Sequence, residues 1–218
     1  MLLGDDDLEL VQIVRTLDEN LYDFVQQFGT FIYIVLFLVV FAKTAFIITP
    51  FMPGDSVVFA SGTLAAVGIL QIEILILLFL IAAISGDSQN FGIGRYLKMN
   101  ERTRIFFYNQ IPVSATDRTT MFIKNHGQNA IVFSRFILLV RTFIPVLSAL
   151  SDYPYRKFLL YNSIGACLWV TVWLGGGYLL GNIPFVANNL SSSLLFITLF
   201  VMIPPIIGYI RQRKKLNN

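Results

Sequence analysis

Ile48-Thr49-Pro50-Phe51-Met52-Pro53-Gly54-Asp55-Ser56 interrupts a run of mostly apolar residues that extends from Gly29 to Leu70. Each of the two prolines removes a backbone N–H and crowds the preceding turn, so a regular α-helix cannot continue through both. Glycine allows backbone conformations that other residues avoid. Broken backbone at membrane depth is tolerated where it lines a cavity or is buried in protein. We therefore predict a hairpin break at Pro50, Pro53 and Gly54.

The composition is that of a membrane protein. Of 218 residues, 56% are hydrophobic and only 13% are charged, and the mean hydropathy is +0.69. A soluble domain usually carries about 25% charged residues. Several segments approach the ~20 apolar residues needed to cross a hydrocarbon core, and they are continuous rather than alternating, which disfavours a β-barrel. We predict an all-α polytopic membrane protein, and the small net charge of +3 does not indicate a nucleic-acid partner.

The apolar segments divide into two kinds. Four are predicted to be full transmembrane helices, at 31–47, 71–96, 158–181 and 194–210. Two contain proline and are predicted to be re-entrant helical hairpins, at 49–70 and 129–150. This membrane domain, 29–210, follows a predicted amphipathic interfacial helix over 1–28, where apolar residues recur at spacings of three and four. It precedes a basic tail over 211–218.

The distribution of Lys and Arg predicts the orientation. Both the 98–127 loop and the 211–218 tail are rich in these residues, whereas the loops predicted on the other side lack them. The positive-inside rule then places both termini in the cytoplasm. The two hairpins enter from opposite faces and form an inverted repeat. Interrupted apolar segments in related positions of two halves are typical of a transporter site at the membrane midplane.

Asp87 is a candidate site residue because an intramembrane carboxylate is a functional candidate by default. Asp87, Asn90 and Gly94 share one helix face. Gly86, Asn90 and Gly94 form a row of small residues that allows a neighbouring helix to approach closely. An alternative role for Asp87 is an ion pair with Arg95, two turns further along the helix.

Arg135 and Arg141 interrupt the second hairpin. On an unbroken helix, two residues six apart point roughly 120° away from each other. The two guanidinium groups therefore converge only if the segment bends or unwinds between them. Pro145 predicts a break at about Arg141–Thr142.

Three further residues carry chemistry. Lys43 lies near the end of the first span, where it either extends to the interface or pairs with an acid. The single cysteine, Cys167, excludes an internal disulfide. The single histidine, His126, disfavours a lipid phosphatase, which typically needs a histidine nucleophile. We predict that the protein is not an enzyme and that it needs no metal or cofactor.

Taken together, these motifs resemble the DedA family, also called SNARE-associated or VTT-domain proteins. The resemblance covers about 31–210 and is carried by Pro50 to Ser56, Gly86-Asp87 with Gly94-Arg95, Arg135-Phe136 with Val140 to Pro145, Tyr155 to Phe158, and Asn162 with Gly165 and Trp169. It implies a multi-pass protein of the bacterial inner membrane with two opposed re-entrant hairpins. It also implies lipid-carrier or proton-coupled transport: some members resemble flippases for undecaprenyl phosphate, and eukaryotic relatives are phospholipid scramblases.

The resemblance also assigns roles to residues. Asp55, Arg135 and Arg141 match positions that the family needs for function, and Asp87 and Arg95 match further motif positions. Many members have a membrane-embedded glutamate where this chain has Lys43, which puts proton coupling at that position in doubt. Lys43 is instead expected to pair with Asp55 or Asp87, or to help bind phosphate.

The leading hypothesis is a transporter of a lipid-linked phosphate, undecaprenyl phosphate or a phospholipid. Arg135 and Arg141 would bind the phosphate, because guanidinium groups match its geometry. Asp55 and Asp87 would carry protons or pair with these arginines. One alternative is a proton- or cation-coupled transporter of small ions that supports membrane potential and pH homeostasis. Another is a structural or assembly protein. The expected partners are membrane lipids, the lipid phosphate and protons, and a homo-oligomer is left open.

Overall fold

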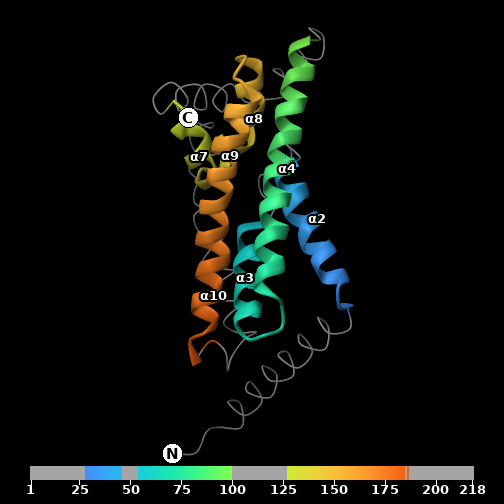
Figure 1. Ribbon diagram of the computed structural model, residues 1–218, viewed down its shortest axis with the longest axis vertical. Helices are drawn as coiled ribbons and strands as arrows, with labels where there is room; N and C mark the ends of the chain where they lie inside the picture. Colours follow the sequence, from blue (N-terminus) through green and yellow to red (C-terminus); the bar gives the residue numbers. More distant parts are fainter. Residues whose placement is uncertain (1–27, 46–53, 100–126, 185, 187–218) are drawn as a thin grey trace, which may run out of the picture. The chain divides into compact units, whose positions relative to one another are not determined.

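The computed structural model describes residues 28–45, 54–99, 127–184 and 186, and all regular elements in these ranges are helical (Figure 1). In chain order they are α2 (Phe31–Ala45), α3 (Gly54–Ala66), α4 (Ile72–Met99), α7 (Asn129–Phe133), the 3₁₀-helix η1 (Ser134–Phe136), α8 (Leu138–Leu150), α9 (Tyr155–Val170), the π-helix η2 (Thr171–Gly175) and α10 (Gly176–Gly181).

Two stretches of helix are long and apolar enough to cross a membrane. They are α4, with 28 residues, and Tyr155–Gly181, with 27 residues, in which α9, η2 and α10 follow one another directly. This confirms helices of spanning length where the sequence predicted spans at 71–96 and 158–181. The first predicted span, 31–47, contains the shorter α2 of 15 residues.

Several predictions concern residues outside the described ranges. These are the interfacial helix over 1–28 except for its last residue, the breaks at Pro50 and Pro53, most of the basic loop over 98–127, the last span over 194–210 and the tail over 211–218.

The described residues form two compact units. Unit 1 contains 28–36, 54–76 and the described residues from 172 onward, and unit 2 contains 37–45, 77–99 and 127–171.

In unit 1, α3 packs against α10 through small residues. A Cβ atom at Gly62 would meet the carbonyl oxygen of Leu174, and one at Gly177 would meet the carbonyl oxygen of Phe59. The Thr63 hydroxyl donates a hydrogen bond of 3.2 Å to the carbonyl of Gly177. The two backbones therefore lie in direct contact, which small residues at a helix interface allow.

In unit 2, the predicted hairpin 129–150 is interrupted, but the predicted position of its break is wrong. The helix ends at Phe133, continues for one 3₁₀ turn, and becomes extended at Ile137 (φ −115°, ψ 106°) before α8 begins. Pro145, predicted to break the hairpin, lies inside α8. Its missing N–H removes one bond, to the carbonyl of Arg141, and the helix continues through it.

The core of unit 2 joins α4, α7, α8 and α9. Phe91 packs against Phe158, with ring centroids 4.7 Å apart, and belongs to a cluster of buried residues that includes Ile131 and Ile144. A Cβ atom at Gly94 would lie 2.6 Å from the carbonyl oxygen of Val146 on α8. The core therefore holds α8 directly against the second half of α4.

The predicted row of small residues on α4 allows two other helices to approach α4 closely. At Gly94 it admits α8, whereas a Cβ atom at Gly86 would meet the side chain of Thr44 on α2. This confirms the close approach that the row predicted and places helices on two sides of it.

Candidate functional site

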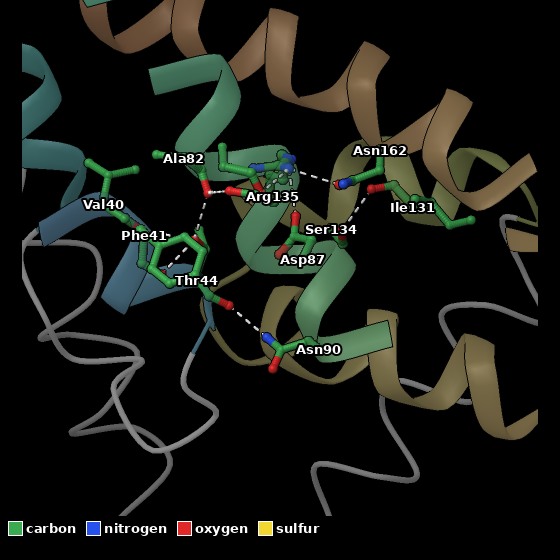
Figure 2. A network of polar contacts seen from close by, with 12 residues as sticks. Val40, Phe41, Thr44, Ala82, Asp87, Asn90, Ile131, Ser134, Arg135 and Asn162 are labelled. Carbon is green, nitrogen blue, oxygen red and sulfur yellow. Dashed lines mark hydrogen bonds and ion pairs between the residues drawn. The ribbon is translucent and has the colours of Figure 1, made fainter. Parts of the chain in front are cut away.

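In unit 2, the buried guanidinium group of Arg135 contacts two other buried polar side chains, each from a different helix (Figure 2). Nη2 of Arg135, on η1, lies 2.5 Å from Oδ2 of Asp87 on α4 and 2.8 Å from Oδ1 of Asn162 on α9. The exposed fractions of these residues are 4%, 7% and 2%. Burying a charge is costly unless it is paired and hydrogen-bonded, and this arrangement provides both for Arg135.

The local backbone conformation positions Arg135 beside Asp87 and Asn162. Gly165 lies three residues after Asn162 on α9, and a Cβ atom there would lie 2.9 Å from the carbonyl oxygen of Val132. The absence of a side chain at this position lets α7 lie directly on α9. The following 3₁₀ turn, in which the Ser134 hydroxyl donates to the carbonyl of Ile131 at 2.7 Å, then places Arg135 within reach of Asn162.

Arg141 lies on the other side of the extended residue Ile137. It is buried, with its guanidinium carbon 5.5 Å from the centroid of the Trp169 ring, which is a cation–π distance. The 3₁₀ turn and the extended backbone at Ile137 bend the segment between the two arginines, which is the condition that the sequence set for their convergence.

Asn90 joins α4 to the end of α2. Its Nδ2 donates to the carbonyl of Thr44 at 2.6 Å, and the Thr44 hydroxyl in turn donates to the carbonyls of Val40 and Phe41 (Figure 2). Lys43 immediately precedes this contact and is only 6% exposed. Its burial does not fit the alternative in which the lysine extends to the interface.

The buried charged residues in the part of the chain that the structure describes are Lys43, Asp87, Arg135 and Arg141, and all four belong to unit 2. Three are cations and one is an acid. This charge distribution favours an anion, and guanidinium groups in particular match the oxygens of phosphate.

Two predicted site residues lie elsewhere. Asp55 is half-buried in the first turn of α3, in unit 1. Arg95 is exposed, and its guanidinium lies 5.5 Å from the centroid of the Phe91 ring. The alternative ion pair between Asp87 and Arg95 is wrong, because the partner of Asp87 is Arg135.

Asn162, Trp169 and Thr44 were not predicted as site residues. Asn162, Gly165 and Trp169 are spaced by three and four, so they share one face of α9. Their spacing is a signal that could have indicated a shared face, but it does not show which arginines that face meets. Thr44 carried no signal beyond its place next to a lysine in an apolar segment.

Apolar helices of spanning length combined with a buried, charged network are typical of an integral membrane protein. Comparison with known proteins identifies the family. Residues 52–179 match the model of the VTT domain. The chain belongs to the DedA family of VTT-domain membrane proteins, as the sequence motifs predicted.

Three relatives from Escherichia coli K12 illustrate the similarity. Protein DedA is 36% identical over 211 residues, which cover 94% of each chain. Inner membrane protein YghB is 32% identical over 175 residues, covering 80% of this chain and 78% of the relative. Inner membrane protein YqjA is 30% identical over 192 residues, covering 86% and 87%. No solved structure matches the chain.

Proposed function

We propose that this protein is a transporter that moves a lipid-linked phosphate, undecaprenyl phosphate or a phospholipid, across the bacterial inner membrane. The proposal rests on the buried cationic network of unit 2, in which Arg135 pairs with Asp87, the one buried acid among the described residues, and Arg141 is buried against Trp169. Buried charge inside apolar helices is costly, so its presence favours a ligand of opposite charge.

The ion pair suggests how the site works. Without substrate, Asp87 and Asn162 hold Arg135 in place at 2.5 and 2.8 Å. A phosphate that enters the site takes the position of the Asp87 carboxylate on Arg135, because guanidinium forms paired, charge-assisted bonds with either group. The released carboxylate then binds a proton or turns to Arg141. Exchange of partners, rather than covalent chemistry, moves the substrate.

The lengths of the helices support the proposed topology of four full spans and two opposed re-entrant hairpins. α3 has 13 residues, which is about 20 Å at 1.5 Å per residue, shorter than a ~30 Å hydrocarbon core. The 129–150 segment consists of two pieces, α7 and α8, with a non-helical residue between η1 and α8. With the basic loop and tail inside, both termini are cytoplasmic.

A second candidate is a proton- or cation-coupled transporter of small ions, in which Asp87 and Asp55 carry the ion. The burial of Asp87 supports it, because a carboxylate in this setting is a natural proton carrier. An ion-flux assay in vesicles without polyprenyl phosphate separates the two. Flux that disappears in Asp55→Asn without any lipid substrate would favour the ion transporter.

Reconstitution into liposomes with a labelled polyprenyl phosphate tests the proposal. The double variant Arg135→Ala, Arg141→Ala is expected to lower the rate of movement about 100-fold or more, because each arginine contributes at least about 1.5 kcal/mol of charge-assisted bonding. The matched control is Arg156→Ala, an exposed arginine at the start of α9, which should keep the wild-type rate. Equal rates for the wild type and the double variant would overturn the proposal.

A further inference from the structure

We infer that the end of α4 and the turn after α8 form a second binding site, specific for the phosphate of an anionic lipid headgroup. The site is a cavity of about 350 Å³ in unit 2, lined by Arg95, Lys98, Met99, Asp152, Tyr153 and Pro154. Its volume is in the range of small-molecule sites. It lies eight residues from Asp87, about 12 Å along the helix, so it is separate from the transport site.

The charges of this cavity, which we call the interfacial pocket, favour an anion. Arg95 and Lys98 are three residues apart on α4 and therefore share a face. Lys98 forms an ion pair with Asp152 at the protein surface. Arg95 stacks on Phe91, which orients the guanidinium and leaves its N–H groups available to a ligand. Two cations against one acid give the pocket a net positive charge.

Tyr153 supplies a neutral donor. Its phenol oxygen is buried and has no hydrogen-bond partner among the described residues. Burial and the neighbouring Tyr161 raise the pKa of this phenol, so the group is protonated at neutral pH. A buried polar group without a partner is costly. Tyr153 lines the interfacial pocket, so a small rotation of its side chain toward the pocket would let a phosphate oxygen accept its hydrogen bond.

The turn that carries these groups is held by the backbone. The N–H of Tyr153 donates to the carbonyl of Ser148 at 2.9 Å, and that of Asp152 to the carbonyl of Ala149 at 3.3 Å. This is the Schellman pattern at a helix end, which usually has glycine in the left-handed position. Here that position is Asp152, with φ 60°. Asp adopts this left-handed conformation more readily than most non-glycine residues, and its carboxylate there pairs with Lys98 beside the pocket.

The surroundings favour a lipid as the source of the phosphate. Tyr96 and Met99 at the end of α4 are 62% and 88% exposed, although both are large and apolar. The basic residues beside this apolar surface are Arg95 and Lys98 of the pocket itself. Apolar and aromatic surface beside basic residues at the end of a span is typical of the headgroup region. The acyl chains would lie against the apolar surface while the pocket binds the phosphate.

Native mass spectrometry of the full chain, released from dodecyl maltoside micelles, tests the inference. Dioctanoyl phosphatidylglycerol is the probe, with dioctanoyl phosphatidylcholine and inorganic phosphate in separate arms. We expect Arg95→Gln to weaken phosphatidylglycerol binding about tenfold, because one charge-assisted interaction is lost. Tyr153→Phe is expected to weaken it severalfold. Arg156→Gln, outside the pocket, is the matched control and should bind as the wild type does.

Asp152→Asn should act in the opposite direction. Asparagine tolerates the left-handed conformation, so the turn is kept. Loss of the carboxylate frees Lys98 and raises the charge of the pocket, and phosphatidylglycerol should bind severalfold more tightly. The proposed site would be overturned if Arg95→Gln and Arg156→Gln weakened phosphatidylglycerol binding equally. It would also be overturned if Asp152→Asn bound this lipid more weakly than the wild type does. Equal binding of phosphatidylcholine would overturn its charge selectivity, and binding of inorganic phosphate alone would overturn the lipid as its source.

Discussion

The two units hold their helices together by different kinds of contact. In unit 1, α3 packs against α10. In unit 2, α4 contacts η1 and α9. Apolar burial provides little driving force between helices inside a membrane, so helices associate through close packing and polar bonds. In unit 1 the backbones of α3 and α10 touch at Gly62 and Gly177. In unit 2 the helices are joined by Asp87, Arg135 and Asn162.

The two contacts depend on different properties of their side chains. The glycine contact depends on size, because a Cβ atom would meet main-chain oxygen that cannot move aside. The polar contact depends on charge, because removal of one partner leaves another charge buried. A contact that depends only on size is expected to be structural, whereas a charged contact costs more to bury and is better explained by function.

The largest effect on stability is expected from Asp87→Ala. It leaves Arg135 buried without its carboxylate, and breaking a buried pair typically costs about 3–5 kcal/mol. Unfolding in mixed micelles with increasing SDS, followed by circular dichroism, measures the change. Glu73→Ala is the control, since Glu73 is an exposed acid on the same helix. Stability equal to that of the control would show that the pair does not hold the helices.

The next largest effect is expected from Gly177→Ala. The added methyl group would meet the carbonyl oxygen of Phe59, and overpacking of this kind costs about 1–3 kcal/mol. Gly175→Ala is a close control, because nothing lies within 4 Å of a Cβ atom at that position. The same unfolding assay should separate the two variants. Similar losses of stability in both variants would mean that the cost comes from the conformation of the helix itself and not from the contact with α3.

Asn162→Ala is expected to cost about 1.5 kcal/mol, the value of a hydrogen bond to a charged group. It removes the oxygen that accepts from Arg135 at 2.8 Å. A double-mutant cycle with Asp87→Ala measures whether the two residues act through the same guanidinium. Strictly additive losses would contradict a shared network.

The smallest effect is expected from Lys98→Ala. Its ion pair with Asp152 is partly to largely exposed, with side-chain exposures of 37% and 79%. Exposed pairs contribute about 0–1 kcal/mol, so the midpoint of unfolding should barely move. A loss as large as that of Asp87→Ala would mean that the turn after α8 is part of the structural core.

The sequence predicted the long helices and their packing faces because these depend on local patterns. The apolar lengths of α4 and of Tyr155–Gly181, and the row of small residues at Gly86, Asn90 and Gly94, follow from composition and helical spacing. The same holds for the choice of Asp87, Arg135 and Arg141, since charge inside an apolar segment is visible without a structure.

The position of the break in 129–150 was not predictable from local signals. Proline suggested Arg141–Thr142, but the chain departs from the helix at Ser134–Ile137, where there is neither proline nor glycine. Arg135 binds partners 48 and 27 residues away in the sequence, on α4 and α9. Contacts of this range decide the local conformation, and the same reason explains why Asn162 was not assigned to the site.

We propose that the buried network of unit 2 serves transport rather than assembly. The most direct test is the double variant Asp87→Leu, Arg135→Leu, because replacing both members of a buried pair by apolar residues often preserves stability. Its unfolding and its movement of labelled polyprenyl phosphate are measured on the same preparation. We predict a stable protein that no longer moves the lipid. A stable double variant that moves the lipid at the wild-type rate would contradict the claim.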